Sequence, residues 1–189
     1  AAPVPGLEFE RARGFQLLPG YERCSFEDQW RGKVGEHSFQ LYEAHLEEER
    51  SSGKSRRWVT LFRGALITIG FARRFNGVTL VERAGRRKSF FGLLGDKDEI
   101  TLDGVRLGRV DMVDPRFEDE FAVWSNDQVE ARYLLTNTFM ERLVALEDLF
   151  AANNGGHCGI QCAFKDGKLL FAIPTNKGWF STGSVFKPA

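Results

Sequence analysis

The segment WSNDQVEARYLLTNTFMERL, from Trp124 to Leu143, places two acids next to a basic residue. Asp127, Glu130 and Arg132 could serve a hydrolase-like enzyme, because general acid and base catalysis needs two groups of different acidity. The same residues could instead fix a turn against a helix, with Asp127 accepting backbone amides and Glu130 or Arg132 forming a buried ion pair. Structural ion pairs are commoner than active sites, so the sequence favours the structural interpretation.

A second candidate site is the cluster His157, Cys158 and Cys162 in the stretch HCGIQC. These side chains could form part of a metal-binding module, but a closed zinc site needs four ligands and no second ligand pair follows. If residues 160–164 form a strand, Cys162 is a buried apolar residue instead. We therefore expect no metal and no cofactor. Three cysteines without disulfide density indicate a reducing compartment, and hence the cytoplasm.

A third candidate is a basic and aromatic loop that contains Arg86, Arg87, Lys88, Phe90 and Phe91. Cationic side chains beside exposed apolar ones suit an anionic membrane surface. Alternatively, the aromatic residues fold into the core while the arginines are solvated. Nucleic acid is not an expected partner, because the net charge is zero and no RNA-binding aromatic motif is present.

The zero net charge hides a strong segmentation of the chain. Residues 1–50, 51–94, 95–150 and 151–189 carry net charges of −4, +9, −8 and +3. Such blocks either pair across neighbouring strands and leave no net field, or they form a basic face. The sequence favours pairing.

The elements that would position these residues are mainly strands. Residues 1–37 predict an irregular lead-in with one short strand near Phe15–Leu18, and residues 38–189 predict a single domain. Two apolar runs around the polar stretch EEERSSGKSRR indicate a hairpin with a long loop. Asn76-Gly77 favours a tight hairpin turn between two further strands.

Later in the chain the period becomes helical. Phe139, Leu143, Leu146 and Phe150 are spaced for one helix face, which predicts a long helix near residues 137–153. Thr138 is the expected start of its capping box. Strands are expected before the helix at 100–102, 109–113 and 121–124, and a hairpin, IQCAF and LLFAIP, is expected after it. This order predicts an α+β fold that is mainly an antiparallel sheet built of hairpins.

The stretch FEDEFAVWSNDQVEARYLLTNTFMERL resembles the signature of a bacterial family, domain of unknown function 3137. A second similarity lies in FRGALITIGFARRFNGVTLV. The signature positions carried over by the resemblance are Asp127, Gln128, Glu130, Arg132 and Tyr133. The family has no established activity, so the resemblance assigns no catalytic residue.

The resemblance also implies a cellular setting. Family members commonly carry hydrophobic N-terminal segments, which implies a soluble domain on the cytoplasmic side of the inner membrane if an anchor was removed. Genes of LemA-like membrane proteins often lie nearby, which implies such a protein as a partner. From the sequence we therefore expect a non-catalytic domain that binds a protein partner or an anionic membrane surface.

Overall fold

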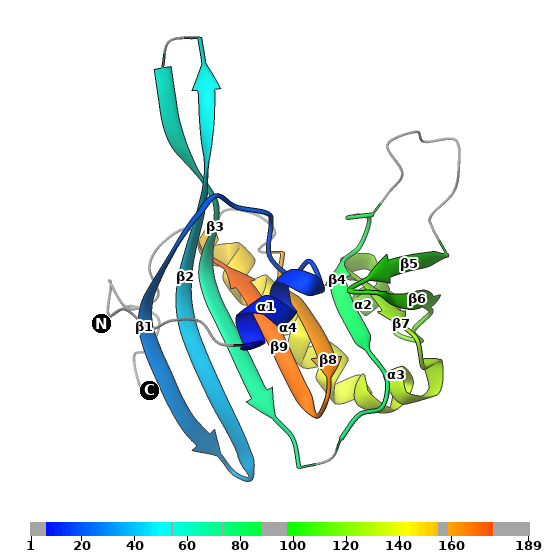
Figure 1. The fold of residues 1–189 in the computed structure, drawn as a ribbon. Coiled ribbons are helices and arrows are strands. Elements are labelled where there is room, and N and C mark those ends of the chain that lie inside the picture. The colour runs from blue at the N-terminus through cyan, green and yellow to red at the C-terminus, as the bar shows by residue number, and fades with distance from the viewer. Residues whose placement is uncertain (1–6, 54, 73, 88–97, 155–158, 176–189) are drawn as a thin grey trace.

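The chain folds around one nine-stranded antiparallel sheet (Figure 1). The computed structural model describes residues 7–53, 55–72, 74–87, 98–154 and 159–175. The strand order across the sheet is β1-β2-β3-β9-β8-β4-β7-β6-β5. The strands are β1 (Arg23–Val34), β2 (His37–Ser52), β3 (Ser55–Gly70), β4 (Thr79–Arg83), β5 (Glu99–Leu102), β6 (Val105–Val110), β7 (Phe121–Ser125), β8 (Gln161–Lys165) and β9 (Lys168–Pro174).

Helices cover both faces of the sheet and give the domain three layers (Figure 1). The helices are α1 (Leu7–Gly14), α2 (Pro115–Glu120), α3 (Gln128–Leu134) and α4 (Asn137–Asn154). Phe9 of α1 belongs to the apolar cluster on one face of the sheet. Met140 and Leu143 of α4 belong to the cluster on the other. The central strands are buried on both faces in this way, and the expected α+β class, mainly antiparallel sheet, is confirmed.

The irregular lead-in expected over residues 1–37 is wrong. This part of the chain holds α1 and the 12-residue strand β1, and Phe15–Leu18 is a turn and not a strand. Phe15 and Leu17 are 0% and 1% exposed, because α1 and the turn after it cover one face of the sheet. This burial depends on strands far along the chain, so local periodicity does not reveal it.

The long loop expected between the first two strands is also wrong. β2 and β3 are 16 residues each and remain paired as far as Ser52 and Ser55. Their outer parts, Glu47–Ser52 and Ser55–Thr60, form an arm that projects from the sheet (Figure 1). The polar residues of the arm stay in the β2–β3 ladder, and Arg56 lies 3.6 Å from Glu49 in a diagonal side-chain pair.

Asn76 and Gly77 do not form the expected hairpin turn. β3 and β4 are not neighbours, because the hairpin of β9 and β8 lies between them. Gly77 also lacks the positive φ of a two-residue turn, whereas Asp166 and Gly167 between β8 and β9 have φ values of 52° and 72°. The dipeptide therefore ends a connection that crosses two strands.

The long helix α4 begins one residue after Thr136. The Oγ1 atom of Thr136 accepts the amide of Phe139 at 3.3 Å, so Thr136 is the capping residue in place of the expected Thr138. Glu147, only 4% exposed, accepts the amides of Gly159 and Ile160 at 2.8 and 2.9 Å. α4 thereby fixes the entry into β8.

Candidate functional site

The signature segment forms a joint between β7, α3 and the connection before β4. Asp127 caps α3, since its Oδ1 accepts the amide of Glu130 at 2.9 Å. The two carboxylate oxygens of Glu130 accept the amides of Asn76 and Gly77 at 3.0 and 2.7 Å. One carboxylate therefore holds two backbone donors from a segment more than fifty positions earlier in the chain.

The joint leaves no free space at Gly77. A Cβ atom added there would lie 2.8 Å from Glu130 Oε2 and 2.9 Å from Asn126 Oδ1. Asn126 Oδ1 also accepts the amide of Val78 at 2.7 Å. Any larger residue at this position therefore requires Glu130 and Asn126 to shift away from the amides of Gly77 and Val78.

The remaining signature residues lie on the outside of α3. Arg132 is exposed and donates to the carbonyl oxygens of Asp111 and Gln128 at 3.3 and 3.4 Å. Gln128 is exposed, and Tyr133 is 62% exposed. The buried ion pair expected of Glu130 or Arg132 is therefore wrong, because backbone amides occupy Glu130 and Arg132 reaches outward to carbonyls.

The same geometry weakens the hydrolase-like interpretation. Asp127 and Glu130 both accept backbone amides, and Arg132 turns to backbone carbonyls. These contacts position a turn and a helix. Each of the three side chains therefore has a structural contact in this joint.

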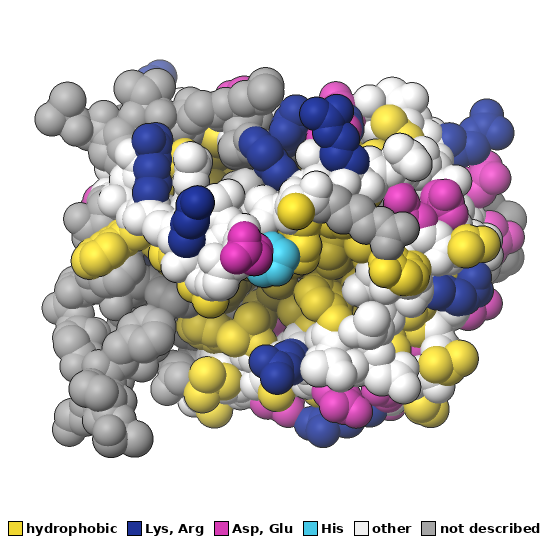
Figure 2. Space-filling model, turned by 90° about the horizontal axis from the view of Figure 1, so that it is seen from below, with side chains coloured by type: hydrophobic (Ala, Val, Ile, Leu, Met, Phe, Trp, Pro, Cys, Tyr) yellow, Lys and Arg dark blue, Asp and Glu magenta, His cyan; other side chains and the backbone are white. Residues whose placement is uncertain are grey.

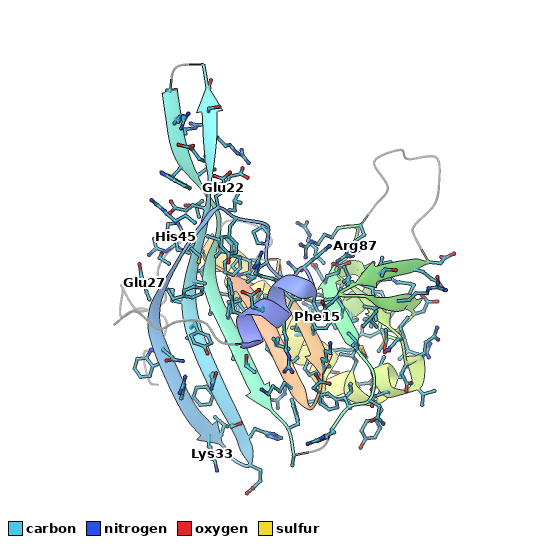
Figure 3. The ribbon with its side chains drawn as sticks, viewed as in Figure 1. Phe15, Glu22, Glu27, Lys33, His45 and Arg87 are labelled. Carbon is cyan, nitrogen blue, oxygen red and sulfur yellow. The ribbon has the colours of Figure 1, made fainter. Side chains whose placement is uncertain are left out.

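Arg86 and Arg87, the described part of the basic and aromatic loop, turn toward the protein. Arg87 donates to Glu82 Oε1 at 2.5 Å and to Gln16 Oε1 at 3.1 Å. Arg86 donates to the Gln16 carbonyl at 3.0 Å and lies 3.8 Å from Glu82 Oε2. Figure 3 shows Arg87 on the side of the molecule where Phe15 follows the end of α1. Lys88, Phe90 and Phe91 lie outside the described residues.

Glu82 is the centre of this network. It is 1% exposed and also accepts the indole N–H of Trp124 at 2.8 Å. One buried carboxylate thus faces two guanidinium groups, from Arg86 and Arg87. Burial lowers the pKa of Arg86, and the charge of Glu82 only partly offsets this.

Sequence reasoning missed Glu82 and Gln16. A signal for Glu82 was present, because it is the only acid among ten basic residues between positions 51 and 94. A lone acid in a basic block is the natural centre of an ion-pair network. The sequence contains no signal for Gln16. Its position is set by the turn after α1, where its φ is 55°, and the sequence did not predict that turn.

The suggested metal cluster is only partly described. Cys162 is fully buried in the apolar cluster under α4, and burial raises the pKa of its thiol. His157 and Cys158 lie outside the described residues. Within the part of the chain that the structure describes, no group of three or more His, Cys, Asp or Glu side chains could hold a metal ion.

The charge blocks pair across neighbouring strands in several places. Arg63 of β3 lies 3.8 Å from Glu27 of β1 and 3.8 Å from Glu43 of β2. Seen from below, a recessed hydrophobic area is bordered mainly by uncharged and hydrophobic side chains, with separate basic and acidic groups near it (Figure 2). The arm adds the pair between Glu49 and Arg56. These contacts fit the paired arrangement better than a single basic face.

Together these features define an α+β domain whose signature segment is a structural joint. The family follows from the sequence. The chain belongs to the family described as protein of unknown function (DUF3137), whose model matches residues 60–189. No curated protein sequence matches the chain significantly.

One solved structure is similar in outline. It is the mycobacterial trehalose monomycolate transport factor A, TtfA, with 13% identity, a TM-score of 0.38, and coverage of 93% of this chain and 85% of that one. This similarity is too low to carry over a function. Among the described residues, no helix is both long and apolar enough to cross a bilayer.

Proposed function

We propose that this domain is a non-catalytic binding module, and that β1 takes up an extended segment of a protein partner as an added strand. The observation that carries the proposal is the position of β1. Among the described strands, β1 pairs with β2 on one side and ends the sheet on the other. An edge strand presents a row of backbone donors and acceptors that another chain can pair with.

The side chains of β1 define the chemistry of such a partner. After a bulge between Glu27 and Gln29, successive side chains alternate between the two faces of the strand. Trp30 and Val34, which are 54% and 71% exposed, share one face. Arg31 and Lys33, both exposed, share the other. A complementary strand alternates apolar residues with acidic ones.

The bulge also limits indiscriminate pairing. Long flat edges aggregate, and natural sheets prevent this with bulges and lysines. β1 has both features, because its register shifts after Glu27 and Lys33 stands near its end (Figure 3). The edge therefore selects for a partner strand that matches the second half of β1.

A protein partner is favoured over an anionic membrane surface. The membrane interpretation requires several cations of the basic loop to face solvent together, whereas Arg87 is largely buried against Glu82 and Gln16. Tethering to the cytoplasmic side of the inner membrane, and a LemA-like membrane protein as the partner, are part of this proposal. They rest on the family resemblance.

The test measures binding of the soluble part of a LemA-like protein from the same bacterium by isothermal titration calorimetry. The double variant Arg31→Glu, Lys33→Glu places acids opposite an acidic partner strand, and we expect its Kd to rise at least about tenfold. The matched control is Arg106→Glu on β6, at the far side of the sheet. It is expected to bind like the unaltered protein.

Hydrogen exchange and vesicles separate the alternatives. Strand addition slows exchange of β1 amides in the complex. Sedimentation with vesicles of phosphatidylglycerol and phosphatidylcholine at low salt tests the membrane. Vesicle binding without partner binding, or equal partner affinity of the double variant and the control, would contradict strand addition at β1.

A further inference from the structure

An open cleft lies between the end of α1, the residue pair after β4 and the turn after β5. Its volume is about 700 Å³, which is within the range of small-molecule sites. Glu10 and Arg13 of α1, Gln16, Arg86 and Asp103 line it. The cleft is separate from β1 and from the signature joint, and the proposed strand addition does not use it.

The acids that line the cleft already have cationic neighbours. Glu10 lies 3.1 Å from Arg13, and Asp103 lies 3.9 Å from Lys165. Each of these carboxylates is about half exposed or more, so both retain oxygens that can accept hydrogen bonds from a ligand. The carboxylates of Glu10 and Asp103 can therefore accept hydrogen bonds from hydroxyl groups of a ligand.

The basic side of the cleft has a surplus of charge. Glu82 is a single carboxylate between Arg86 and Arg87, so one positive charge in this half-buried network is not balanced by it. Arg86 is the member that lines the cleft. Its side chain is 34% exposed, and burial lowers its pKa, so an anion beside it would replace lost hydration.

Gln16 fixes the position of this charge. Its backbone carbonyl accepts from Arg86, and its side-chain oxygen accepts from Arg87. Its backbone amide donates to the Arg13 carbonyl at 2.8 Å. The two arginines are thus held before any ligand arrives. A site held in advance loses less conformational entropy on binding.

We propose that this cleft binds a phosphorylated polyol, with the phosphate at Arg86 and Arg13 and the hydroxyl groups at Asp103 and Glu10. Guanidinium groups match phosphate geometry, and carboxylates accept hydrogen bonds from hydroxyls. The smallest such group is glycerol phosphate. It can arrive as a free metabolite or as the headgroup of a lipid.

The test titrates sn-glycerol 3-phosphate into the unaltered protein by calorimetry and follows amide resonances of residues 10–20. We expect saturable binding, and a Kd at least about tenfold weaker for Arg86→Ala, because one charge-assisted contact is lost. The matched control is Arg83→Ala, an exposed arginine three positions earlier that does not line the cleft. It is expected to leave the Kd unchanged.

A second variant guards against a folding defect in Arg86→Ala. Arg13→Gln removes a cation from an exposed position of α1 and is expected to weaken binding without lowering Tm by more than a few degrees. Vesicles identify the source of the ligand. Sedimentation with phosphatidylglycerol but not phosphatidylcholine vesicles, lost in Arg86→Ala, supports a lipid headgroup, whereas binding of the free compound alone supports a metabolite.

Two results would overturn the site. One is the absence of binding to both the free compound and the vesicles. The other is equal loss in Arg86→Ala and Arg83→Ala, which indicates a diffuse charge effect. The β1 double variant keeps this site intact, so failure at the cleft and failure at the edge strand are distinguishable.

Discussion

At the residue scale, several acids of this domain accept hydrogen bonds from backbone amides. Glu130 holds Asn76 and Gly77, Glu147 holds two amides before β8, and Glu118 accepts the amide of Met112 at 2.7 Å. Charge-assisted bonds of this kind are stronger than neutral ones. The acids therefore fix connections that the sheet alone does not hold.

Replacing Glu130 tests this role directly. Glu130→Gln places an amide group where an acceptor is needed for Asn76 or Gly77, so we expect the free energy of unfolding to fall by about 1.5–3 kcal/mol. Urea denaturation followed by circular dichroism measures it. Glu141→Gln, on an exposed position of α4, is the control and should change stability by less than about 0.5 kcal/mol. Equal losses of stability in the two variants would contradict the role of Glu130 in holding Asn76 and Gly77.

The buried thiol of Cys162 predicts a pH dependence. Burial raises its pKa in the folded protein, so the thiol ionises first in the unfolded chain, above pH about 8.5. The contribution of the buried thiol to the free energy of unfolding is fully present below that pH. Above it, this contribution falls by about 1.4 kcal/mol per pH unit. Urea midpoints between pH about 9 and 10 should fall less steeply in Cys162→Ala.

At the element scale, β3 lies in two different environments along its length. Its outer part belongs to the polar arm, and its inner part packs Phe62 and Leu66 into the apolar cluster under α1. In the arm, Arg23 of β1 stacks on the Trp58 ring at 4.5 Å and pairs with Glu47. Side-chain pairs replace a core in this part of the strand.

The contact between β3 and β9 is tightest at Gly64. A Cβ atom there would lie 2.1 Å from the Ile173 carbonyl oxygen and 2.9 Å from the Pro174 Cα. Because these are backbone atoms, Gly64→Ala must separate the strands, and we expect a loss of about 1–3 kcal/mol in thermal or urea unfolding. Gly108→Ala in β6 is the control, since its Cβ would meet nothing closer than 3.8 Å. A similar stability for both variants would show that β9 can shift.

At the scale of the whole molecule, the sequence predicted the features that depend on local residue patterns. The α+β class follows from many strand-like runs and one strongly periodic helical segment. The family assignment follows from two segments with distinctive residues. Such features are local, so they can be read without knowing the fold.

The features that the sequence could not predict depend on distant contacts. α1 is defined by burial of Phe9 and Phe15 against strands that follow much later. The polar arm continues the pairing of β2 with β3 beyond the core, and its polar residues show no strand-like apolar alternation in the sequence. The role of Glu130 depends on Asn76 and Gly77, and no local pattern links these positions.

The place of the C-terminal hairpin in the sheet has a consequence for synthesis of the protein. β9 pairs with β3 and β8 pairs with β4, so the last strands of the described chain join its two earlier groups of strands. During translation, β1 to β3 and β4 to β7 therefore emerge with open inner edges, and they remain so until residues up to Pro174 have left the ribosome. Pairings between such distant positions form slowly. Until they form, the unpaired strand edges can pair with other chains. The nascent polypeptide thus depends on the arrival of β8 and β9 to cover these edges.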